Sequence, residues 1–202
     1  MSEEESLKIV LLGESDVGKA KIITQLIDQT FQEDTQSTTG GAFAMKYLRC
    51  DNKILKLEIW DTAGQEKYRS LIRIFCEDAK AVILVYDITS KNSFEEIKNY
   101  WIKEVKELCN KNVILAIVGN NSDLFEREQV NEEEARKLAE DLGAIFVTNT
   151  FRSPESINYL FLEIAKKYTE CSEVAFIEKD DIGRFQYFHT IITKKLSKWK
   201  NY

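Results

Sequence analysis

The sequence predicts an α/β fold, in which a mostly parallel sheet is covered by helices on both faces. Short apolar runs alternate with longer amphipathic segments along the 202-residue chain. Strands that alternate with helices of ten or more residues are typical of βαβ units, whose crossover helices cover both faces of a parallel sheet. The predicted strands are residues 7–12, 42–49, 55–60, 81–86, 113–118 and 144–147, and the predicted helices are residues 19–28, 94–109, 132–142 and 154–168.

The second and third predicted strands are expected to form an antiparallel hairpin at one edge of the sheet. Only Asp51, Asn52 and Lys53 separate the two strands, and Asp and Asn favour tight turns. In the helix 94–109 the apolar residues recur at helical spacing, so we expect one stripe of this helix to face the sheet. The residues of this stripe are Phe94, Ile97, Trp101, Val105 and Leu108.

The overall composition is that of an ordinary globular domain and excludes some partners. Hydrophobic residues make up 44% of the chain and charged residues 31%. The formal net charge of -6 argues against a nucleic-acid partner, because nucleic-acid binders are usually basic. The acidic residues 3–5 are unlike a signal or transit peptide, so a cytoplasmic location is expected. Four cysteines without a C-x-x-C pair favour reduced thiols: Cys50, Cys76, Cys109 and Cys171.

Residues 13–20 read GESDVGKA and match the phosphate-binding pattern G-x-x-x-x-G-K-[ST] except at the last position. The segment lies between a predicted strand and a predicted helix. Glycines let backbone N–H groups turn toward an anion, the helix N-terminus adds partial positive charge, and Lys19 adds a full charge. Ala20 lacks the hydroxyl that normally binds Mg²⁺, so we expect a weakened metal site. The expected phosphate-binding residues are Glu14, Ser15, Asp16, Val17, Gly18, Lys19 and Ala20.

Two further motifs follow predicted strands. Asp61 ends the third strand, where a carboxylate can hold Mg²⁺ through water. The backbone N–H of Gly64 can bind a terminal phosphate, and Gln65 can orient an attacking water. After the fifth strand, the carboxylate of Asp123 can accept two hydrogen bonds from the edge of guanine, and Asn120 can tie loops together beneath the base.

Taken in order, these motifs resemble the Ras superfamily of small GTPases, and most closely its Rab branch, with a first switch segment nearest to the endosomal Rab subgroup. The resemblance covers residues 7 to 168 and implies a three-layer P-loop NTPase fold with a six-stranded sheet and five helices. It also implies a GTP/GDP switch in vesicular traffic, which binds protein effectors and regulators through residues 31–45 and 61–75. The segments that carry it are LEIWDTAGQE (57–66), YRSL (68–71), VYDIT (85–89) and STTGGAF (37–43).

The resemblance also implies roles for single residues. Lys19, Thr38 and Gln65 match the catalytic positions, with Thr38 contacting both Mg²⁺ and the γ-phosphate. Asp61 matches the water-mediated metal ligand and Gly64 the γ-phosphate glycine. Two further positions, Asn120 and Asp123, match the residues that read guanine, and Thr150-Phe151-Arg152 stands where the family has the Ser-Ala-Lys segment whose backbone N–H reads the guanine oxygen.

Four departures from the family pattern put efficient catalysis in doubt. Ala20 replaces the Mg²⁺-binding hydroxyl, and Asn121 replaces the lysine whose stem covers the base. Asp16 adds a carboxylate for which three alternatives are open: it would repel the phosphates, bind the metal or point to solvent. The bulky Phe151 can still donate its backbone N–H, and its ring is a candidate cover for the base. We therefore expect weak Mg²⁺ dependence, quick nucleotide release and slow hydrolysis; the alternative is a pseudo-GTPase that serves as an interaction scaffold.

The chain is expected to divide into a GTPase domain, residues 1–170, and an extension, residues 171–202. Apolar residues recur in the extension at steps of three and four, with lysines between them, which predicts a basic amphipathic helix. This helix would dock on the domain, lie on an anionic membrane such as that of an endosome or another vesicle, or begin a further module. A cysteine near the end is absent, so prenylation there is not expected. The apolar positions are Phe185, Phe188, Ile192, Leu196 and Trp199.

Overall fold

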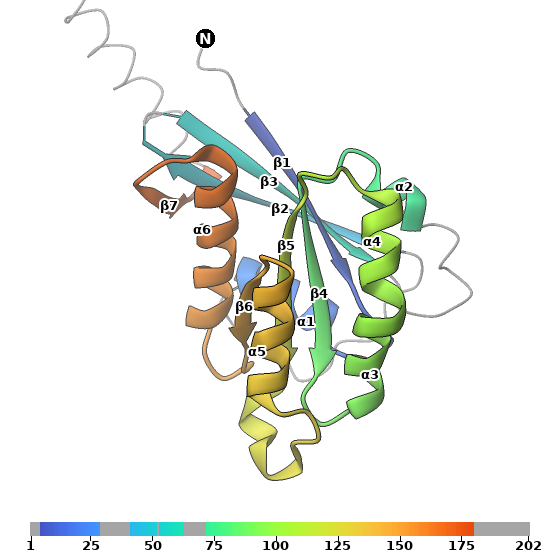
Figure 1. Cartoon of the computed structure of the whole chain (residues 1–202). Coiled ribbons are helices and arrows are strands. Elements are labelled where there is room, and N and C mark those ends of the chain that lie inside the picture. Colours follow the sequence, from blue (N-terminus) through green and yellow to red (C-terminus); the bar gives the residue numbers. More distant parts are fainter. Residues whose placement is uncertain (1–4, 29–40, 52, 63–71, 180–202) are drawn as a thin grey trace, which may run out of the picture.

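The computed structural model describes residues 5–28, 41–51, 53–62 and 72–179. Within these ranges a seven-stranded sheet forms the middle of three layers, with helices on both of its faces (Figure 1). The strand order is β6-β5-β4-β1-β3-β2-β7, in which β2 and β7 are antiparallel to their neighbours and the other strands are parallel. The predicted α/β fold with a mostly parallel sheet is therefore confirmed.

All six predicted strands are present, and their ends differ from the prediction by at most two residues. The antiparallel hairpin is also present, with Cys50 paired to Lys53 beside the turn. Asp51 in that turn has a positive φ of 49°, which Asp tolerates better than most residues. The strands are β1 (Glu5–Leu12), β2 (Gly41–Cys50), β3 (Lys53–Thr62), β4 (Ala81–Asp87), β5 (Ile114–Asn120), β6 (Ile145–Thr148) and β7 (Val174–Ile177).

The seventh strand corrects the expectation of a six-stranded sheet with the hairpin at its edge. β7 pairs with the end of β2, and a backbone hydrogen bond of 3.0 Å from Asp51 N to the Glu173 carbonyl extends the pairing. This run of four residues was not predicted as a strand; it follows α6 and pairs with β2 at that edge of the sheet. The expected extension from residue 171 thus begins in the sheet, whereas its predicted helix lies outside the described residues.

The helices of the described ranges are divided between the two faces of the sheet (Figure 1). Alternate residues of β1 point to opposite faces, so that Ile9 lies on the first face and Val10 on the second. The first face is covered by α1 (Lys19–Asp28) and α6 (Glu155–Thr169), and the second by α2 (Ile72–Cys76), α3 (Lys91–Glu96), α4 (Ile102–Leu108) and α5 (Glu132–Asp141). A 3₁₀ segment, η3 (Ser122–Arg127), follows β5.

The helix predicted for residues 94–109 is present but irregular. α3 continues into a π-helical turn, η2 (Ile97–Trp101), and then into α4. The predicted apolar stripe does face the sheet, because its first four residues are buried and Leu108 packs against the same cluster. Single π-helical turns often occur at functional sites, and Trp101 in this turn contacts the loop that follows β1.

The carboxyl ends of the parallel strands lie at one end of the molecule, toward which the arrow of β4 points in Figure 1. The described ranges contain no helix that is long and apolar enough to cross a membrane. In open sheets of this kind, ligands bind where the loops at the carboxyl ends of the strands lie together. The fold therefore places the loops after β1, β5 and β6, and the end of β3, where a ligand is expected.

Candidate functional site

The loop between β1 and α1 is shaped by two glycines. Gly13 and Gly18 have φ values of 146° and 90°, which residues with a side chain rarely adopt. A Cβ on Gly13 would lie 2.3 Å from the carbonyl oxygen of Val85, and one on Gly18 would lie 2.3 Å from Nδ2 of Asn120. Only glycine fits at either position. The loop can therefore turn sharply into the N-terminus of α1, where backbone N–H groups are available to an anion.

Lys19 is held inside this loop. Its side chain is 6% exposed, and its ammonium group donates to the carbonyl oxygens of Gly13 (2.9 Å) and Glu14 (2.7 Å). Burial lowers the pKa of Lys19 to about 8, although the nearby charge of Asp61 acts to raise it. A phosphate bound in the loop would stabilise the charged form of this buried amine, so the site is suited to a phosphorylated ligand.

Asp16 lies on the solvent side of the loop. The residue is exposed and has a φ of 62°, a left-handed conformation that Asp tolerates. Solvent weakens the interaction of an exposed charge with a bound phosphate. The exposure of the residue fits the alternative in which the carboxylate points to solvent, although its charge still acts to raise the pKa of Lys19.

The described residues offer few ligands for Mg²⁺. Asp61, 1% exposed, is the buried carboxylate at the end of β3, and Ala20 in the first turn of α1 supplies no side-chain oxygen. The hydroxyl of Thr62 already donates to the carbonyl oxygen of Leu11 at 2.7 Å. The described part of the chain contains no group of three or more His, Cys, Asp or Glu that could hold a metal. These residues fit Mg²⁺ only as an ion held through water by Asp61 and directly by phosphate oxygens of a ligand.

A buried amide network joins three loops. Asn120, fully buried at the end of β5, donates from Nδ2 to the Val17 carbonyl (2.7 Å), and its Oδ1 accepts a hydrogen bond from Nδ2 of Asn149 (2.9 Å). Asn149, also fully buried, accepts a hydrogen bond from the hydroxyl of Ser156 (2.7 Å). From α1, Gln25 donates to the Thr150 carbonyl (3.0 Å). The loop after β1 is thereby fixed relative to the loops after β5 and β6.

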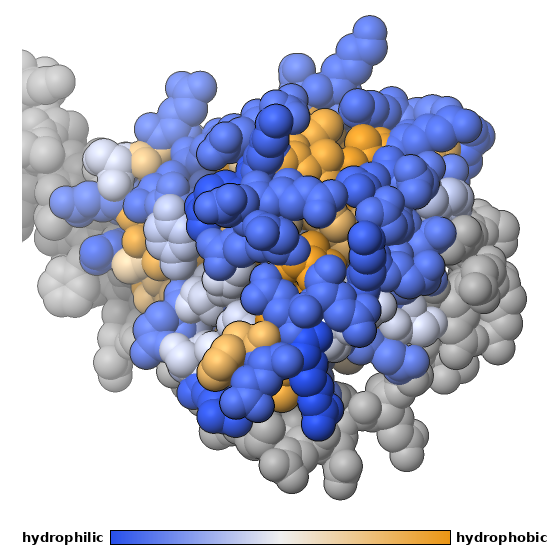
Figure 2. All heavy atoms as spheres, turned by 60° about the horizontal axis from the view of Figure 1, so that its bottom comes forward, coloured by the Kyte–Doolittle hydropathy of each residue, from blue (hydrophilic) through white to orange (hydrophobic). Residues whose placement is uncertain are grey.

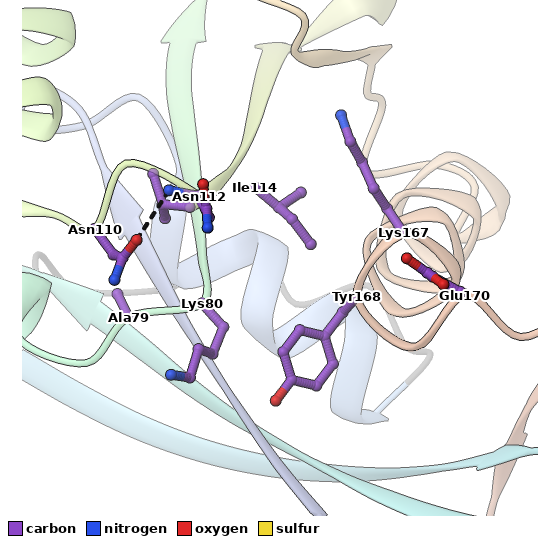
Figure 3. Close-up of a pocket in the computed structure, with 9 residues that line it drawn as sticks. Ala79, Lys80, Asn110, Asn112, Ile114, Lys167, Tyr168 and Glu170 are labelled. Atoms are coloured by element: carbon purple, nitrogen blue, oxygen red, sulfur yellow. Dashed lines mark hydrogen bonds between the residues drawn. The ribbon is translucent and has the colours of Figure 1, made fainter.

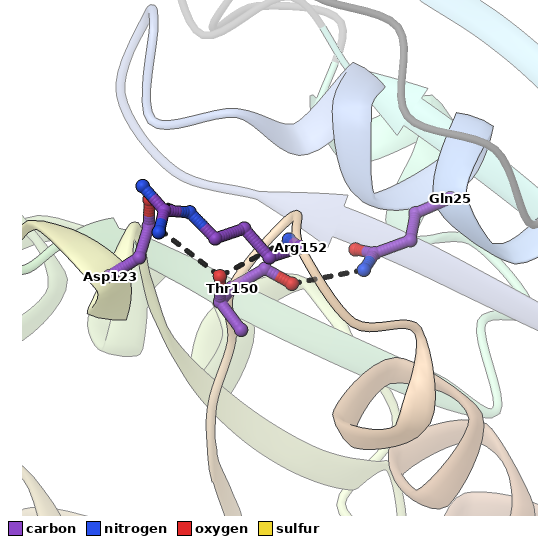
Figure 4. Close-up of polar contacts among 4 residues, drawn as sticks. All are labelled: Gln25, Asp123, Thr150 and Arg152. Atoms are coloured by element: carbon purple, nitrogen blue, oxygen red, sulfur yellow. Dashed lines mark hydrogen bonds and ion pairs between the residues drawn. The ribbon is translucent and has the colours of Figure 1, made fainter.

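The carboxylate of Asp123 lies beside the loop after β6 (Figure 4). The Thr150 hydroxyl donates to its Oδ1 at 3.2 Å, and Arg152 Nε lies 3.3 Å from its Oδ2. The side chain of Arg152 is 76% exposed, whereas that of Asp123 is 21% exposed. Thr150 therefore positions the carboxylate, and Arg152 covers it from solvent in a surface ion pair of low strength.

Two departures from the family pattern have defined places in the structure. Asn121 adopts a left-handed conformation with φ 63°, and its Nδ2 donates to Oδ2 of Asp87 at 2.7 Å. The ring of Phe151 packs against Gly18, and the ammonium of Lys21 lies 5.5 Å from the centre of that ring. Asn121 is thus turned toward the end of β4, while the bulk of Phe151 is accommodated against the loop after β1 and the start of α1.

The structure also adds residues that the sequence did not single out. Trp101 donates from Nε1 to Oε1 of Glu14 at 3.2 Å, which ties the π-helical turn to the loop after β1. Gln25 and Asn149 were missed as well, although a buried polar residue among apolar neighbours in an amphipathic helix is a signal that could have marked Gln25. A pocket of about 310 Å³ borders the outer side of the loop, between residues 14–17 and the start of α3.

The structure brings most of the predicted site residues together, and three of the predicted residues are not among those that it describes. Figure 2 shows the end of the molecule that carries the site, and its described surface is mainly hydrophilic. Residues 14–20, Asp61, Asn120, Asp123 and residues 150–152 lie on loops at this end or next to them. Thr38, Gly64 and Gln65 lie outside the described residues.

Comparisons with known proteins agree with this geometry. The sequence model of the Ras family matches residues 8–170. The chain is also similar to the Ras-related protein RHN1 of Nicotiana plumbaginifolia, with 41% identity over 160 residues, which are 79% of this chain and 80% of that relative. The matched region contains the loops after β1, β3, β5 and β6.

Replacing Asn149 with alanine should destabilise the fold and loosen the site. The change leaves Oδ1 of Asn120 and the hydroxyl of Ser156 without their partner. Each buried group left unpaired costs about 1–3 kcal/mol, so the free energy of unfolding should fall by about 2–4 kcal/mol in urea denaturation. Asn112→Ala, at an exposed position, is the matched control and should change it by less than about 0.5 kcal/mol. Equal stability of the two variants would contradict the network.

The affinity of the site for a nucleoside diphosphate should fall above about pH 8. The empty protein holds Lys19 with a pKa of about 8, so its ammonium is lost as the pH rises through that value. Only the charged form attracts phosphate, and binding should therefore weaken about tenfold between pH 7 and pH 9. Isothermal titration calorimetry at several pH values measures this. Lys19→Met should bind the nucleoside diphosphate more weakly, and its affinity should not fall between pH 7 and pH 9. The same fall in both proteins would show that another group causes the pH dependence.

Proposed function

Because the chain belongs to the Ras family of small GTPases, we propose that it is an atypical switch of the Rab type, which binds GTP and GDP and hydrolyses GTP slowly. Members of the Ras family bind guanine nucleotides and Mg²⁺ and hydrolyse GTP. The Rab assignment, the role in vesicular traffic and the slow hydrolysis rest on the sequence motifs and on the departures from them.

The observation that carries the proposal is the assembly of three loops by the buried amide network. Asn120 holds the phosphate-binding loop through Val17, and Asn149 holds Asn120. The same arrangement presents the Asp123 carboxylate, which can accept hydrogen bonds from N1–H and the exocyclic amine of guanine. Adenine lacks that pair of donors, so a carboxylate here selects guanine over adenine.

The phosphate end of the nucleotide would be held by the loop after β1. Backbone N–H groups of residues 14–19 and the ammonium of Lys19 would bind the β- and γ-phosphate oxygens. Gly64 would donate its backbone N–H to the γ-phosphate, and Gln65 would orient the attacking water, as the family resemblance implies. Lys19 would have to exchange at least one of its two carbonyl partners for a phosphate oxygen.

The metal side of the site is the basis for slow hydrolysis. Mg²⁺ in this family neutralises charge that develops on the phosphates. In this chain Asp61 would hold it through water and Thr38 directly, while Ala20 contributes no ligand. We propose that the nucleotide is therefore held mainly by contacts that do not involve the metal, so that its affinity depends little on Mg²⁺.

An exposed aromatic surface supports the proposed binding of effectors and regulators. Phe43, 46% exposed on β2, lies with its ring centre 4.7 Å from that of Trp60, and Trp60 lies 6.0 Å from Phe75 of α2. Met45, two residues after Phe43 in β2, and Ile74, next to Phe75 in α2, are also exposed. Contiguous exposed apolar side chains mark sites of protein association. We call these five residues the aromatic surface, and they belong to or border the segments 31–45 and 61–75 expected to bind partners.

One observation favours the alternative function, a pseudo-GTPase scaffold. The Asp123 carboxylate is already satisfied by Thr150 and Arg152, and Asn121 is turned toward Asp87. Because protein groups already bind the Asp123 carboxylate, this carboxylate does not need guanine as a partner. The fold could therefore stay intact without a nucleotide. Arg152 is largely exposed, however, and such an ion pair contributes about 0–1 kcal/mol, so guanine can displace it at little cost.

The two functions are separated by nucleotide binding to the full chain after it has been stripped of nucleotide. The proposed function predicts that GDP and GTP bind at least about a hundredfold more tightly than ADP, because the Asp123 carboxylate rejects adenine. Asp123→Ala should reduce this preference to about tenfold or less, while Arg152→Ala is the control that should retain it. Absence of binding at millimolar GDP would support the scaffold, and equal binding of ADP would contradict guanine recognition.

Restoring the missing hydroxyl should make nucleotide binding depend on Mg²⁺. In the natural chain, chelation of Mg²⁺ should lower the GDP affinity by less than about tenfold. In Ala20→Ser, chelation should lower the GDP affinity by more than about tenfold, because one added metal ligand is worth about 1.4 kcal/mol or more. Titration calorimetry with Mg²⁺ and with a chelator measures both. The two proteins should bind alike under chelation. An unchanged Mg²⁺ dependence in Ala20→Ser would refute the metal argument.

A further inference from the structure

The last described strand leads the chain toward the aromatic surface. β7 is antiparallel to β2, and its final residue, Ile177, lies opposite Tyr47. The chain therefore leaves the sheet in the direction that runs back along β2. An ion pair between Glu178 and Lys46 (3.6 Å) continues this alignment by one residue. The next residue of β2 in this direction is Met45, which belongs to the aromatic surface.

The second face of the sheet is uncovered at β2 among the described residues. Side chains of a strand alternate between the two faces, so Phe43, Met45 and Tyr47 share the second face. β2 contributes no described residue to the core cluster of that face, and Phe43 and Met45 are 46% and 45% exposed. Ile177 lies opposite Tyr47 and therefore on the same face. Residues 180–202, which we call the tail, thus follow a strand that ends beside an uncovered apolar surface.

The sequence of the tail, which lies outside the described residues, predicts a helix of the right length for this surface. Its expected apolar stripe covers residues 185–199, or about 21 Å at 1.5 Å per helical residue. The ring centre of Trp60 lies 4.7 Å from that of Phe43 and 6.0 Å from that of Phe75. Met45 lies two strand residues from Phe43, which is about 7 Å. The stripe can therefore extend over the whole aromatic surface.

The charge of the tail is opposite to that of the rest of the chain. The tail contains five Lys and Arg residues and two Asp residues, a formal net charge of +3. Because the whole chain has a net charge of -6, residues 1–179 carry -9. Two exposed carboxylates, Glu77 and Asp78, directly follow α2, the helix that contributes Phe75 to the aromatic surface. At moderate salt, opposite charges attract over about 10 Å, which favours contact between the tail and the domain.

We propose that the tail docks as an amphipathic helix on the aromatic surface of its own chain. Its apolar stripe covers Phe43 and Met45, and its lysines remain in water or near the carboxylates that follow α2. Because β7 tethers the tail beside β2, its effective concentration at this surface is in the millimolar range. A partner protein must displace the tail before it binds there. This competition rests on the proposed partner binding, whereas the docking itself involves neither a partner nor a nucleotide.

A cavity elsewhere on the described surface is a poorer site for the tail. It has a volume of about 480 Å³ and lies where β4 and β5 begin, at the end of the sheet opposite the nucleotide site. Its lining includes Lys80 and Lys167, whose side chains lie on different sides of the cavity in Figure 3, together with Asn110 and Asn112. Glu170 offsets only one of the two ammonium charges. Like charges repel, so this cavity disfavours a segment that is rich in lysine.

The first test is photo-cross-linking in the full chain, with p-benzoylphenylalanine in place of Phe188 on the apolar stripe. After irradiation, trypsin digestion and mass spectrometry, peptide 185–194 should be joined to a peptide that carries part of the aromatic surface. These peptides are 22–46, 57–67 and 74–80. The matched control has the same probe in place of Lys194, on the opposite side of the expected helix. It should give at least about fivefold less of these products.

The second test measures how well the tail covers Met45. Hydrogen peroxide converts accessible methionine to its sulfoxide, so a docked tail should protect Met45 from oxidation. We expect Met45 to be oxidised at least about threefold faster in a stripe variant that combines Phe188→Ser, Ile192→Ser and Leu196→Ser. The matched control should be oxidised at the natural rate, because its three changes lie on the opposite side of the helix: Thr190→Ala, Ser197→Ala and Asn201→Ala.

Other occupants and other sites give different results, each of which would overturn the proposal. A cross-link to a second copy of the chain would assign the stripe to self-association, and one to peptide 112–127 or 168–179 would assign it to the cavity. Loss of the cross-link on addition of phosphatidylserine vesicles would assign the tail to a membrane. Equal oxidation of Met45 in the natural chain and the stripe variant would show that the tail does not cover this surface. None of these measurements requires nucleotide, so their failure is distinct from a failure of guanine recognition.

Discussion

The hydrogen bond from Asn120 to the Val17 carbonyl is the contact on which the rest of the site depends. It joins the end of β5 to the phosphate-binding loop, and both of its ends are buried. A buried amide without a partner costs about 1–3 kcal/mol, so the loop and the end of β5 are stable only together. Asn149 and Gln25 extend the same constraint to the loop after β6 and to α1. The phosphate site and the base site are therefore one unit.

The departures from the family pattern are accommodated within this unit. Gly18 leaves room for Nδ2 of Asn120, and the ring of Phe151 also packs against this glycine. Asn121 is satisfied by Asp87 at the end of β4, and Asp123 by Thr150 and Arg152. Asn121, Thr150 and Arg152, which differ from the family pattern, thus find partners within the protein.

The architecture could be predicted from the sequence because it depends on local patterns. Apolar runs and amphipathic periods located the six strands and the main helices, and the order of motifs located the loops of the site. The four-residue β7 and the five-residue α2 were missed, since both exist only through tertiary contacts. A π-helical turn needs no more than one extra residue and leaves no periodic trace. Asn149 was missed because its role is visible only when three loops are placed together.

The environment of Asp16 was also open in the sequence, and the structure shows that the residue is exposed and has a left-handed backbone conformation. The local sequence therefore predicted which residue types lie at the site, whereas long-range packing determined which of their side chains are in contact.

The most direct test of the central claim is amide hydrogen exchange in the chain stripped of nucleotide. If the buried amide network assembles the site without a ligand, the amides of residues 119–122 and 149 should already be protected, and GDP should change their protection little. The backbone hydrogen bonds of Ser122 N to the Asn149 carbonyl (2.9 Å) and of Asn149 N to the Gly119 carbonyl (2.8 Å) are the specific reporters. Free exchange of these amides until GDP is added would show that the nucleotide, and not the network, builds the site.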